Sequence, residues 1–323
     1  MREDEPPILI SAVSGDIGYS VVQALQAKAF RIIGCDLKPY TPVRHLLDNF
    51  YEVPPATDPE NYFIAIKKII NEERLQFFLP ISEPEIALIH NRREEFTDLN
   101  IKLLLNNRLI LDTFLNKMKT VRFLSKIGIK VPKTSLLHEY QEHFEFPVIV
   151  KSLEGYGSNK LCKVDNKYDL EYIKRKYDSS YIIQECIGTP EEEYTTGVFS
   201  DGKNISSISF RRKLGVDGTT LEAILVHENR LHELSCKIAE ATSLTGSINI
   251  QSRRLEDIFI PFEINPRISG TILFRKQFGF DDVSWWIDML SNKEYHYKPL
   301  YKSGMAFRYY SQYYYGMERI ESI

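Results

Sequence analysis

The segment FEINPRISGT, at residues 262–271, brings three side chains with chemical potential close together. Glu263 and Asn265 belong to an apolar stretch that is typical of a buried strand, and Arg267 lies just beyond Pro266. In a strand, residues two apart share a face, so Glu263 and Asn265 point the same way. Polar groups in such a strand need partners, which here are either a bound cation or a hydrogen-bond network at the end of a sheet.

The preceding segment, SINIQSR, predicts a neighbouring strand on which Asn249 and Gln251 share one face and two isoleucines share the other. If the two strands are antiparallel neighbours, Gln251 comes close to Glu263 and Asn265, and each of the three offers an oxygen. Mg²⁺ prefers oxygen ligands, few of them from protein, with phosphate oxygens supplying the rest. Arg267 could then bind a phosphate through two parallel hydrogen bonds.

The first third of the chain alternates apolar strands with helices, which predicts a parallel α/β sheet of the Rossmann-like kind. We place this first domain at residues 1–105. Its expected strands are residues 7–13, 30–36, 75–81 and 101–106, with a capped helix at 57–73 and further helices after 13 and after 81.

The rest of the chain mixes hairpins with helices, which favours an α+β arrangement. We expect two further domains, 106–184 and 185–323. The expected elements are a helix within 111–134 that ends at Gly128, strands at 146–152 and 181–187 around a helix near 166–178, two strands within 192–213, a helix at 228–246, and a helical segment after 280.

Composition excludes several classes of protein. The chain has 323 residues, of which 43% are hydrophobic and 26% charged, and this balance suits two or three globular domains. A net charge of −3 with dispersed basic residues gives no reason to expect nucleic acid. We expect no membrane span and no signal peptide, because long apolar windows are absent and the first residues are acidic. Four scattered cysteines without a C-x-x-C motif indicate reduced thiols in the cytoplasm.

The segments GSINIQSR and FEINPRISGT resemble the metal-binding end of the ATP-grasp superfamily. The likeness is to the branch that includes the carbamoyl phosphate synthase large subunit and related carboxylate–amine ligases, and it covers roughly residues 7–290. It implies an N-terminal Rossmann-like domain followed by the two-lobed ATP-grasp fold. By this resemblance Gln251, Glu263 and Asn265 hold the Mg²⁺ (or Mn²⁺) of Mg-ATP, and Arg267 stabilises the transferring phosphoryl group.

The resemblance extends to the smaller lobe. Lys117 matches a lysine that contacts ATP phosphate, although Lys119 is close enough to compete for that assignment. Lys151 ends the apolar strand FPVIVKS, where a lysine needs an anion or solvent, and the family places a nucleotide-contacting lysine there. The segment EGYGSNK that follows resembles the glycine-rich flap over the phosphates, which would involve Gly155, Gly157 and Ser158; taken alone it is an ordinary hairpin turn.

The segment IIQECIGTPEEEYTTG resembles the hinge between the two lobes. Backbone groups of Glu185, Cys186 and Ile187 would contact the adenine edge. Glu193 would bind the ribose hydroxyls, although three consecutive glutamates leave the register open by one residue.

A basic run, SFRRK, supplies a further candidate. A run of this kind is commonly a solvated strand edge, but in the family a basic residue here faces phosphate or a substrate carboxylate. Strand alternation allows only one of Arg211 and Arg212 to point into the site. We name Arg211 as a catalytic candidate beside Arg267 and Lys151, while the alternation itself leaves the choice open.

The resemblance implies an ATP-dependent ligase that joins a small-molecule carboxylate to an amine through an acylphosphate, with ATP and Mg²⁺ as cofactors. The chain has room for one ATP-grasp module, which argues against carbamoyl phosphate synthesis. We expect a cytoplasmic enzyme with no nucleic-acid or membrane partner, and a homodimer is compatible with this assignment. An ATP-grasp kinase or an ATP-binding regulatory protein remain alternatives.

A different class of enzyme also has some support. The turn AVSGDIG follows a strand, and Asp36 ends the next one, which partly resembles a dinucleotide-binding fingerprint. Tyr172 and Lys176 have the spacing found in NAD(P)-dependent nucleotide-sugar epimerases and short-chain dehydrogenases. However, the first glycine of the fingerprint is missing, and Tyr172 lies in a charged helix without an identifiable serine partner.

Overall fold

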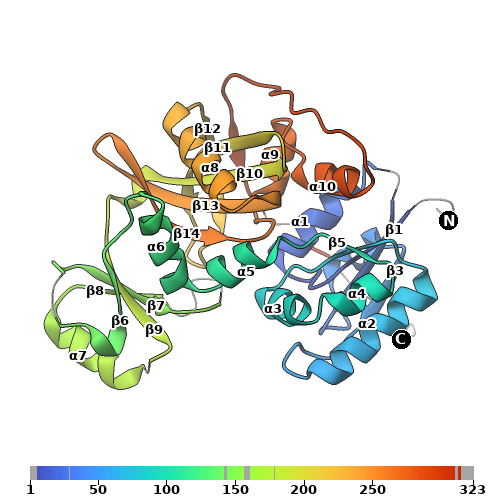
Figure 1. The fold of residues 1–323 in the computed structure, drawn as a ribbon, viewed down its shortest axis with the longest axis horizontal. Coiled ribbons are helices and arrows are strands. Elements are labelled where there is room, and N and C mark those ends of the chain that lie inside the picture. Colours follow the sequence, from blue (N-terminus) through green and yellow to red (C-terminus); the bar gives the residue numbers. More distant parts are fainter. Residues whose placement is uncertain are drawn as a thin grey trace, which may run out of the picture.

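The computed structural model describes residues 6–28, 30–141, 144–155, 161–177, 179–309 and 312–313. Within these residues the chain forms three β-sheets, which occupy separate parts of the molecule (Figure 1). The domain division given above stays a prediction. The sheets follow one another along the chain, and β9 of the second sheet ends at Glu185, one residue past the predicted boundary.

The first sheet is parallel, with strand order β3-β2-β1-β4-β5. Its central strand, PILI, is buried along its whole length, because helices cover both faces of a parallel sheet. The elements are β1 (Pro7–Ile10), α1 (Asp16–Leu25), β2 (Arg31–Asp36), η1 (Pro42–Leu46), β3 (Asn49–Glu52), α2 (Pro59–Glu73), β4 (Phe77–Leu79), α3 (Glu83–Asn91), α4 (Glu94–Asp98) and β5 (Lys102–Leu103). The prediction of a parallel α/β fold is confirmed.

Two short helices, α5 (Arg108–Phe114) and α6 (Lys117–Lys126), follow where the sequence pattern predicted one. The prediction of a continuous helix was wrong because Asn116 caps a new helix: its side chain accepts the N–H of Lys119 at 3.0 Å. The segment leaves the second helix through Gly128, which has a positive φ of 71°. The break places Lys117 in the first turn of α6.

The second sheet is antiparallel, with strand order β6-β9-β7-β8. Alternate apolar residues of β7 and β9 pack with α7 to form a small core of their own. The elements are β6 (Thr134–Leu136), η2 (Leu137–Glu139), β7 (Val148–Ser152), β8 (Leu161–Val164), α7 (Lys167–Lys176) and β9 (Tyr181–Glu185).

The third sheet is also antiparallel, with strand order β14-β13-β10-β11-β12-β15. The predicted pair of strands within 192–213 and the adjacent pair that carries the site motif are confirmed. The elements are η4 (Pro190–Glu192), β10 (Glu193–Asp201), β11 (Ile205–Leu214), β12 (Thr220–Val226), α8 (Asn229–Ala241), β13 (Thr245–Leu255), β14 (Ile258–Asn265), α9 (Ile272–Gln277), α10 (Asp282–Leu290) and β15 (Met305–Phe307).

The two faces of β13 and β14 have opposite characters. Ile248, Ile250 and Ile264 are buried against α5, α6 and α8. The alternate residues on the same strands are polar and face away from that core. The helices α5 and α6 therefore hold the apolar face of the sheet while leaving the polar face open toward the first two sheets.

Among the described residues, none of the helices is long and apolar enough to cross a membrane.

Candidate active site

A cavity of about 690 Å³ lies where the three sheets meet. Its walls include loops after β1 and β4 in the first sheet, β7 and β9 in the second, and β10 to β14 in the third. The predicted site residues Lys117, Lys151, Gly155, Glu185, Cys186, Ile187, Glu193, Gln251, Glu263, Asn265 and Arg267 all line it. Gly157 and Ser158 lie outside the described residues.

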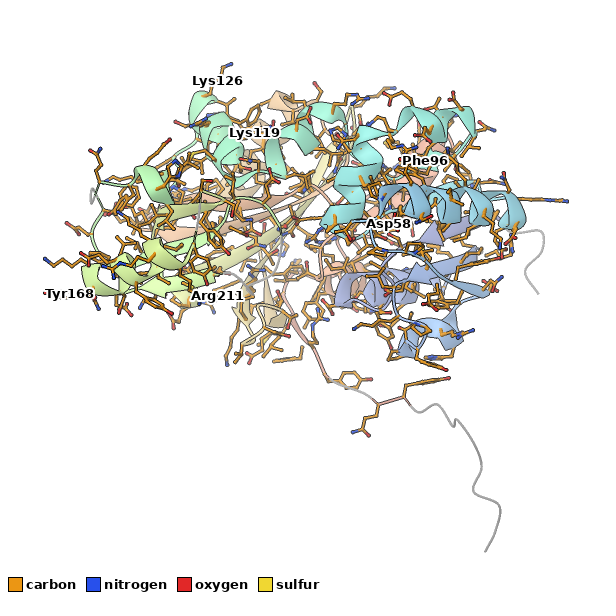
Figure 2. The ribbon with its side chains drawn as sticks, turned by 90° about the horizontal axis from the view of Figure 1, so that it is seen from below. Asp58, Phe96, Lys119, Lys126, Tyr168 and Arg211 are labelled. Atoms are coloured by element: carbon orange, nitrogen blue, oxygen red, sulfur yellow. The ribbon has the colours of Figure 1, made fainter. Side chains whose placement is uncertain are left out.

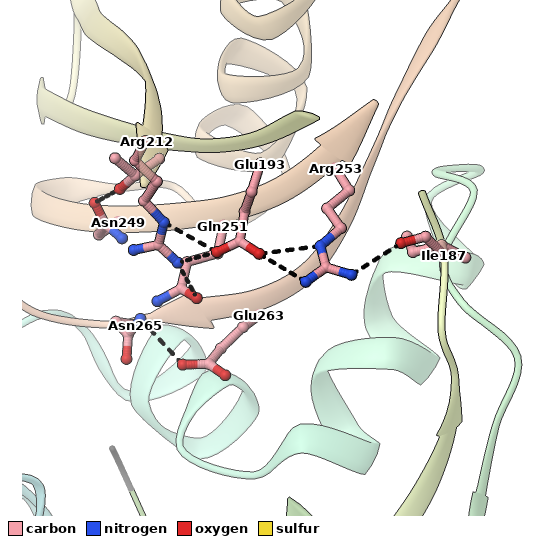
Figure 3. Close-up of polar contacts among 9 residues, drawn as sticks. Ile187, Glu193, Arg212, Asn249, Gln251, Arg253, Glu263 and Asn265 are labelled. Atoms are coloured by element: carbon pink, nitrogen blue, oxygen red, sulfur yellow. Dashed lines mark hydrogen bonds and ion pairs between the residues drawn. The ribbon is translucent and has the colours of Figure 1, made fainter. Parts of the chain in front are cut away.

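The predicted pairing of the two motif strands is confirmed. Gln251 lies directly opposite Glu263, and Asn249 lies opposite Asn265. Asn265 donates its amide N–H to Glu263 Oε1 at 3.4 Å. Asn249 is engaged elsewhere, because its side-chain oxygen accepts from the hydroxyl of Thr195 at 2.9 Å (Figure 3). The three predicted cation ligands therefore meet at one wall of the cavity.

A β-bulge changes the alternation of β14 at this wall. Gln251 pairs with Glu263 but Ser252 pairs with Pro261, so Phe262 is an extra residue in the ladder. The bulge allows Phe262 and Glu263, although adjacent, both to line the cavity. It also leaves the carbonyl of Phe262 available to accept a hydrogen bond from Lys151 Nζ at 3.3 Å.

Lys151, which is buried, and Glu263, which is partly buried, are a cation and an anion of the same cavity. Burial lowers the pKa of Lys151 to about 8, although the charge of Glu263 acts in the opposite direction. Burial alone would raise the pKa of Glu263, but Lys151, Lys117 and Arg212 together outweigh it, and the pKa of Glu263 is lowered. Glu263 is therefore an ionised carboxylate at neutral pH, surrounded by positive charge.

Lys117, rather than Lys119, faces the cavity. Lys117 Nζ donates to the carbonyl of Gly155 at 2.7 Å, which connects the start of α6 to the start of the predicted flap. Gly155 has a φ of +90°, a conformation that favours glycine. Lys119 is exposed on the outer face of the same helix (Figure 2).

Arg267 is buried and lies between the third sheet and the first. It donates to the carbonyl of Ile268 at 3.0 Å and to Glu83 Oε1 at 3.3 Å. Glu83 is the first residue of α3, and both side chains of this ion pair are only 10% exposed. Burial raises the pKa of Glu83, and the charge of Arg267 opposes that rise. Glu83 was not among the predicted site residues; its position just after a parallel strand, where such sheets place their sites, was the available signal.

The structure corrects the choice between the two arginines of β11. The Arg212 side chain is 8% exposed and donates to Glu193 Oε1 at 2.7 Å and to Gln251 Oε1 at 2.9 Å. The Arg211 side chain is 43% exposed, lies 3.7 Å from Glu192, and is outside the cavity wall (Figure 2). Placing Arg211 in the site was wrong, because successive residues of a strand face opposite sides and the inward position belongs to Arg212.

The three consecutive glutamates occupy different positions relative to the cavity. Glu193 begins β10, is buried and lines the cavity, whereas Glu191 and Glu192 belong to the preceding turn and do not. Glu193 accepts from Arg212 through one oxygen and from Arg253 through the other (Figure 3). Arg253 was not predicted as a site residue, although the segment SINIQSR places it on the predicted strand, two residues after Gln251.

The segment predicted to be the hinge lines the cavity. Glu185 ends β9 and its side chain accepts the backbone N–H of Lys133 at 3.1 Å. Cys186 and Ile187 follow at the cavity wall, and the carbonyl of Ile187 accepts a hydrogen bond from Arg253.

The residues of the rival dinucleotide fingerprint have structural partners. Asp36 accepts the backbone N–H groups of Ser14 at 2.8 Å and Lys38 at 3.1 Å, which fixes the loop after β1. Gly18 is required for packing, since a Cβ there would lie 2.4 Å from the carbonyl oxygen of Ala12. Tyr172 is exposed on α7 and is not part of the cavity wall. These positions are therefore explained without a bound dinucleotide.

Two family models match the chain. Residues 180–313 match the family described as "ATP-grasp in the biosynthetic pathway with Ter operon". Residues 8–104 match the family described as "PylC-like, N-terminal domain". These matches support an ATP-grasp assignment, and the ATP-grasp match itself covers less than half of the chain. The candidate metal ligands Gln251, Glu263 and Asn265, together with Arg267, lie within that match.

The curated relatives are distant, and this chain matches only part of the length of each of them. The α-aminoadipate–LysW ligase LysX of Saccharolobus solfataricus is 26% identical over 141 residues, which is 39% of this chain and 51% of the relative. The carbamoyl phosphate synthase large chain of Pseudothermotoga lettingae is 24% identical over 276 residues, or 78% of this chain. The match spans only 24% of that large chain.

Solved structures share the fold. N5-carboxyaminoimidazole synthetase from Staphylococcus aureus, complexed with ADP, superposes with a TM-score of 0.74 and 15% identity over 93% of this chain and 81% of that one. L-amino acid ligase from Bacillus licheniformis superposes with a TM-score of 0.70 and 14% identity over 88% of this chain and 74% of the ligase. At these identities the likeness establishes the ATP-grasp architecture, which confirms the predicted fold.

Proposed function

We propose that this protein is an ATP-dependent ligase that joins a small-molecule carboxylate to an amine through an acylphosphate. One observation carries the proposal: a single cavity at the junction of the three sheets brings Gln251, Glu263 and Asn265 together with the cations Lys151 and Arg267. Oxygen donors beside buried cations suit a metal-bound polyphosphate. Relatives with ligase names in both sets of comparisons support the same reaction class.

Magnesium, or manganese in its place, would be held by the carboxylate of Glu263 and the amide oxygens of Gln251 and Asn265. Among the described residues, His, Cys, Asp and Glu form no group of three that could hold a metal ion. The site therefore depends on one ionised carboxylate and two neutral oxygens, a set that fits a hard cation whose remaining ligands are phosphate oxygens. When bound, the metal would neutralise phosphate charge.

The cations of the cavity would bind and orient the phosphates. Lys151 and Lys117 would contact phosphate oxygens from the smaller lobe, and Arg267 would stabilise the phosphoryl group in transfer. Arg212 takes the place that the sequence analysis gave to Arg211, next to Gln251. The backbone of the hinge and the carboxylate of Glu193 would bind adenine and ribose.

The reaction would then proceed in two displacements. A carboxylate oxygen of one substrate attacks the γ-phosphorus of ATP, and ADP leaves. The amine nitrogen of the second substrate attacks the acyl carbon, phosphate leaves with the bonding electrons, and the nitrogen loses a proton. Catalysis would rest on positioning and electrostatics, and no covalent attachment to the protein is needed. We place this reaction in the cytoplasm, with small molecules as the partners.

The test begins with binding. Mg-ATP and NAD(P)⁺ are titrated into the wild type, Glu263→Gln and Glu256→Gln by calorimetry. Glu256 lies at the exposed turn between β13 and β14 and outside the cavity wall, so it is the matched control. We expect Mg-ATP to bind the wild type and Glu256→Gln alike, and Glu263→Gln at least tenfold more weakly.

A screen of carboxylate and amine pairs for ADP and phosphate release follows. Release that requires both substrates and gives a C–N-bonded product supports the ligase. A phosphorylated product formed without an amine assigns a kinase, and Mg-ATP binding without turnover across the screen assigns a regulatory ATP-binding role. Binding of NAD(P)⁺ but not Mg-ATP would contradict the proposal altogether.

A further inference from the structure

Arg253 connects two walls of the nucleotide cavity through one side chain. Its Nε donates to Glu193 Oε2 at 3.0 Å, and a terminal nitrogen lies 2.9 Å from the same oxygen. Its other terminal nitrogen donates to the carbonyl of Ile187 at 3.1 Å (Figure 3). The guanidinium also lies 5.8 Å from the ring centre of Phe262. One planar group therefore fixes the hinge backbone and the carboxylate at the start of β10.

The register of the third sheet explains this placement. Arg253 of β13 lies directly opposite Glu193 of β10, so its side chain need not reach far to meet the carboxylate. Arg253 is also two residues after Gln251 and shares its face of the strand, which is the cavity face. The chain turns between Ile187 and Glu193, and the two guanidinium contacts close that turn.

The two arginines that hold Glu193 have different second partners. Arg212 binds one carboxylate oxygen and reaches on to Gln251, toward the candidate metal ligands. Arg253 binds the other oxygen and reaches to Ile187, toward the hinge. The Glu193 side chain is 5% exposed, so its orientation is set by these two contacts. Loss of Arg253 would remove the hydrogen bond to Glu193 Oε2 and the link to Ile187, while Arg212 would still hold Glu193 Oε1.

We propose that Arg253 is a positioning residue for the nucleoside: it orients Glu193 toward the ribose hydroxyls and holds the hinge carbonyl of Ile187 in place beside the base. The inference rests on the proposed function, because it takes the occupant of the cavity to be ATP. Arginine suits this role and lysine does not, since only the planar fork can donate to a carboxylate and a carbonyl in fixed directions. Arg253 would act through Glu193 and Ile187 on the nucleoside, and not on the phosphates.

The experiment compares three probes on four proteins. Mg-ATP, Mg-2′-deoxy-ATP and magnesium tripolyphosphate are titrated into the wild type, Arg253→Met, Arg253→Lys and Arg254→Met. Arg254 is the matched control: it is the next residue, and it donates to the carbonyl of Glu256 away from the cavity wall. Thermal unfolding of each variant identifies any that fails to fold, and Arg253→Lys provides a second variant that keeps the charge.

We expect Arg253→Met to bind Mg-ATP about tenfold or more weakly, as a lost hydrogen-bond network around a carboxylate predicts. Its binding of Mg-2′-deoxy-ATP should fall less, so that the preference of the wild type for the ribose form disappears. Tripolyphosphate affinity should stay within about twofold of the wild type, because that probe has no nucleoside. Arg253→Lys should recover little of the ribose preference, and Arg254→Met should match the wild type.

Two results would overturn the inference. If Arg253→Met keeps the ribose preference of the wild type, Arg253 does not orient Glu193. If affinity for all three probes falls equally, Arg253 supports the cavity as a whole rather than the nucleoside. A wild type that fails to bind Mg-ATP would instead reject the proposed function, and the inference with it, so the two failures are told apart by the wild type alone.

Discussion

Lys151 is a buried amine whose charge state depends on pH near neutrality. Burial lowers its pKa to about 8, well below the value of 10.5 for a lysine in solvent. An unfolded chain holds this proton up to about pH 10.5, so below pH 8 both states are protonated and the folded state bears the full cost of the buried charge. As pH rises from about 8 to 10.5 that cost disappears, so the stability of the folded state increases over this range until Lys151 no longer opposes folding. Binding of phosphate requires the opposite, charged form.

Mg-ATP affinity should therefore fall as pH rises above about 8. Deprotonation of Lys151 removes a cation from the phosphate site, so we expect a loss approaching tenfold per pH unit in the wild type. The Lys151→Arg variant keeps its positive charge over this range, and its affinity should change much less. Calorimetric titrations at about pH 7 and about pH 9.5 measure the difference. Equal pH dependence in the two proteins would assign the effect to another group.

Individual site residues differed in how far the sequence could predict them. The pairing of Gln251 with Glu263 followed from strand alternation, which depends only on local geometry. The choice between Arg211 and Arg212 required the register of β11 against its neighbours, which the sequence does not state. Arg253 was missed because its partners, Glu193 among them, are far away along the chain.

At the scale of elements, the capped start of α3 positions Glu83, which pairs with Arg267 far along the chain. Its N-cap, Ser82, accepts the N–H of Glu85, and the Glu85 side chain accepts the N–H of Ser82, which makes a capping box. The cap fixes the first turn and with it Glu83. A capping sequence of this kind is readable in advance, whereas the helix break at Asn116 was hidden because apolar residues continue on both sides.

Ser82→Ala should destabilise the protein by about 1 kcal/mol, the usual effect of removing an N-cap. Ser82→Thr keeps a hydroxyl that can accept from the same N–H and should lose less. Urea unfolding, followed by circular dichroism without nucleotide, measures both changes. An alanine variant as stable as the wild type would show that the cap contributes nothing to folding, and that Glu83 is positioned by its ion pair alone.

At the scale of the molecule, buried side chains hold the first sheet against the third. Glu83 pairs with Arg267 across this boundary. Asn106, fully buried after the last strand of the first sheet, donates to the carbonyls of Ser247 at 2.7 Å and Pro266 at 2.9 Å. These contacts reach the two strands that carry the candidate metal ligands. Sequence patterns could indicate the separate sheets, but they could not indicate which side chains would connect the first sheet to the third.

A double-mutant cycle on Glu83→Gln and Arg267→Met should reveal a coupling free energy of about 1–3 kcal/mol in urea unfolding. The reason is that each single change leaves a buried charge without its counter-ion, while the double change removes both. Glu85→Gln is the matched control, because Glu85 is also buried in α3 but bonds Ser11, Ser82 and Tyr62. Its coupling to Arg267→Met should stay below about 0.5 kcal/mol; similar coupling in both cycles would argue against a specific pair.

The shared cavity also has a consequence for the order of events when the chain folds. Its walls come from residues as far apart in sequence as Ala12 and Thr271, and from all three sheets. The first and second sheets each have a core formed by contacts that are closer along the chain, while a further apolar cluster joins the first sheet to the third. Contacts that are close along the chain form sooner than distant ones. After dilution from urea, circular dichroism should therefore recover before a fluorescent ATP analogue binds. The secondary structure of the three sheets would form first, and the cavity between them would form last.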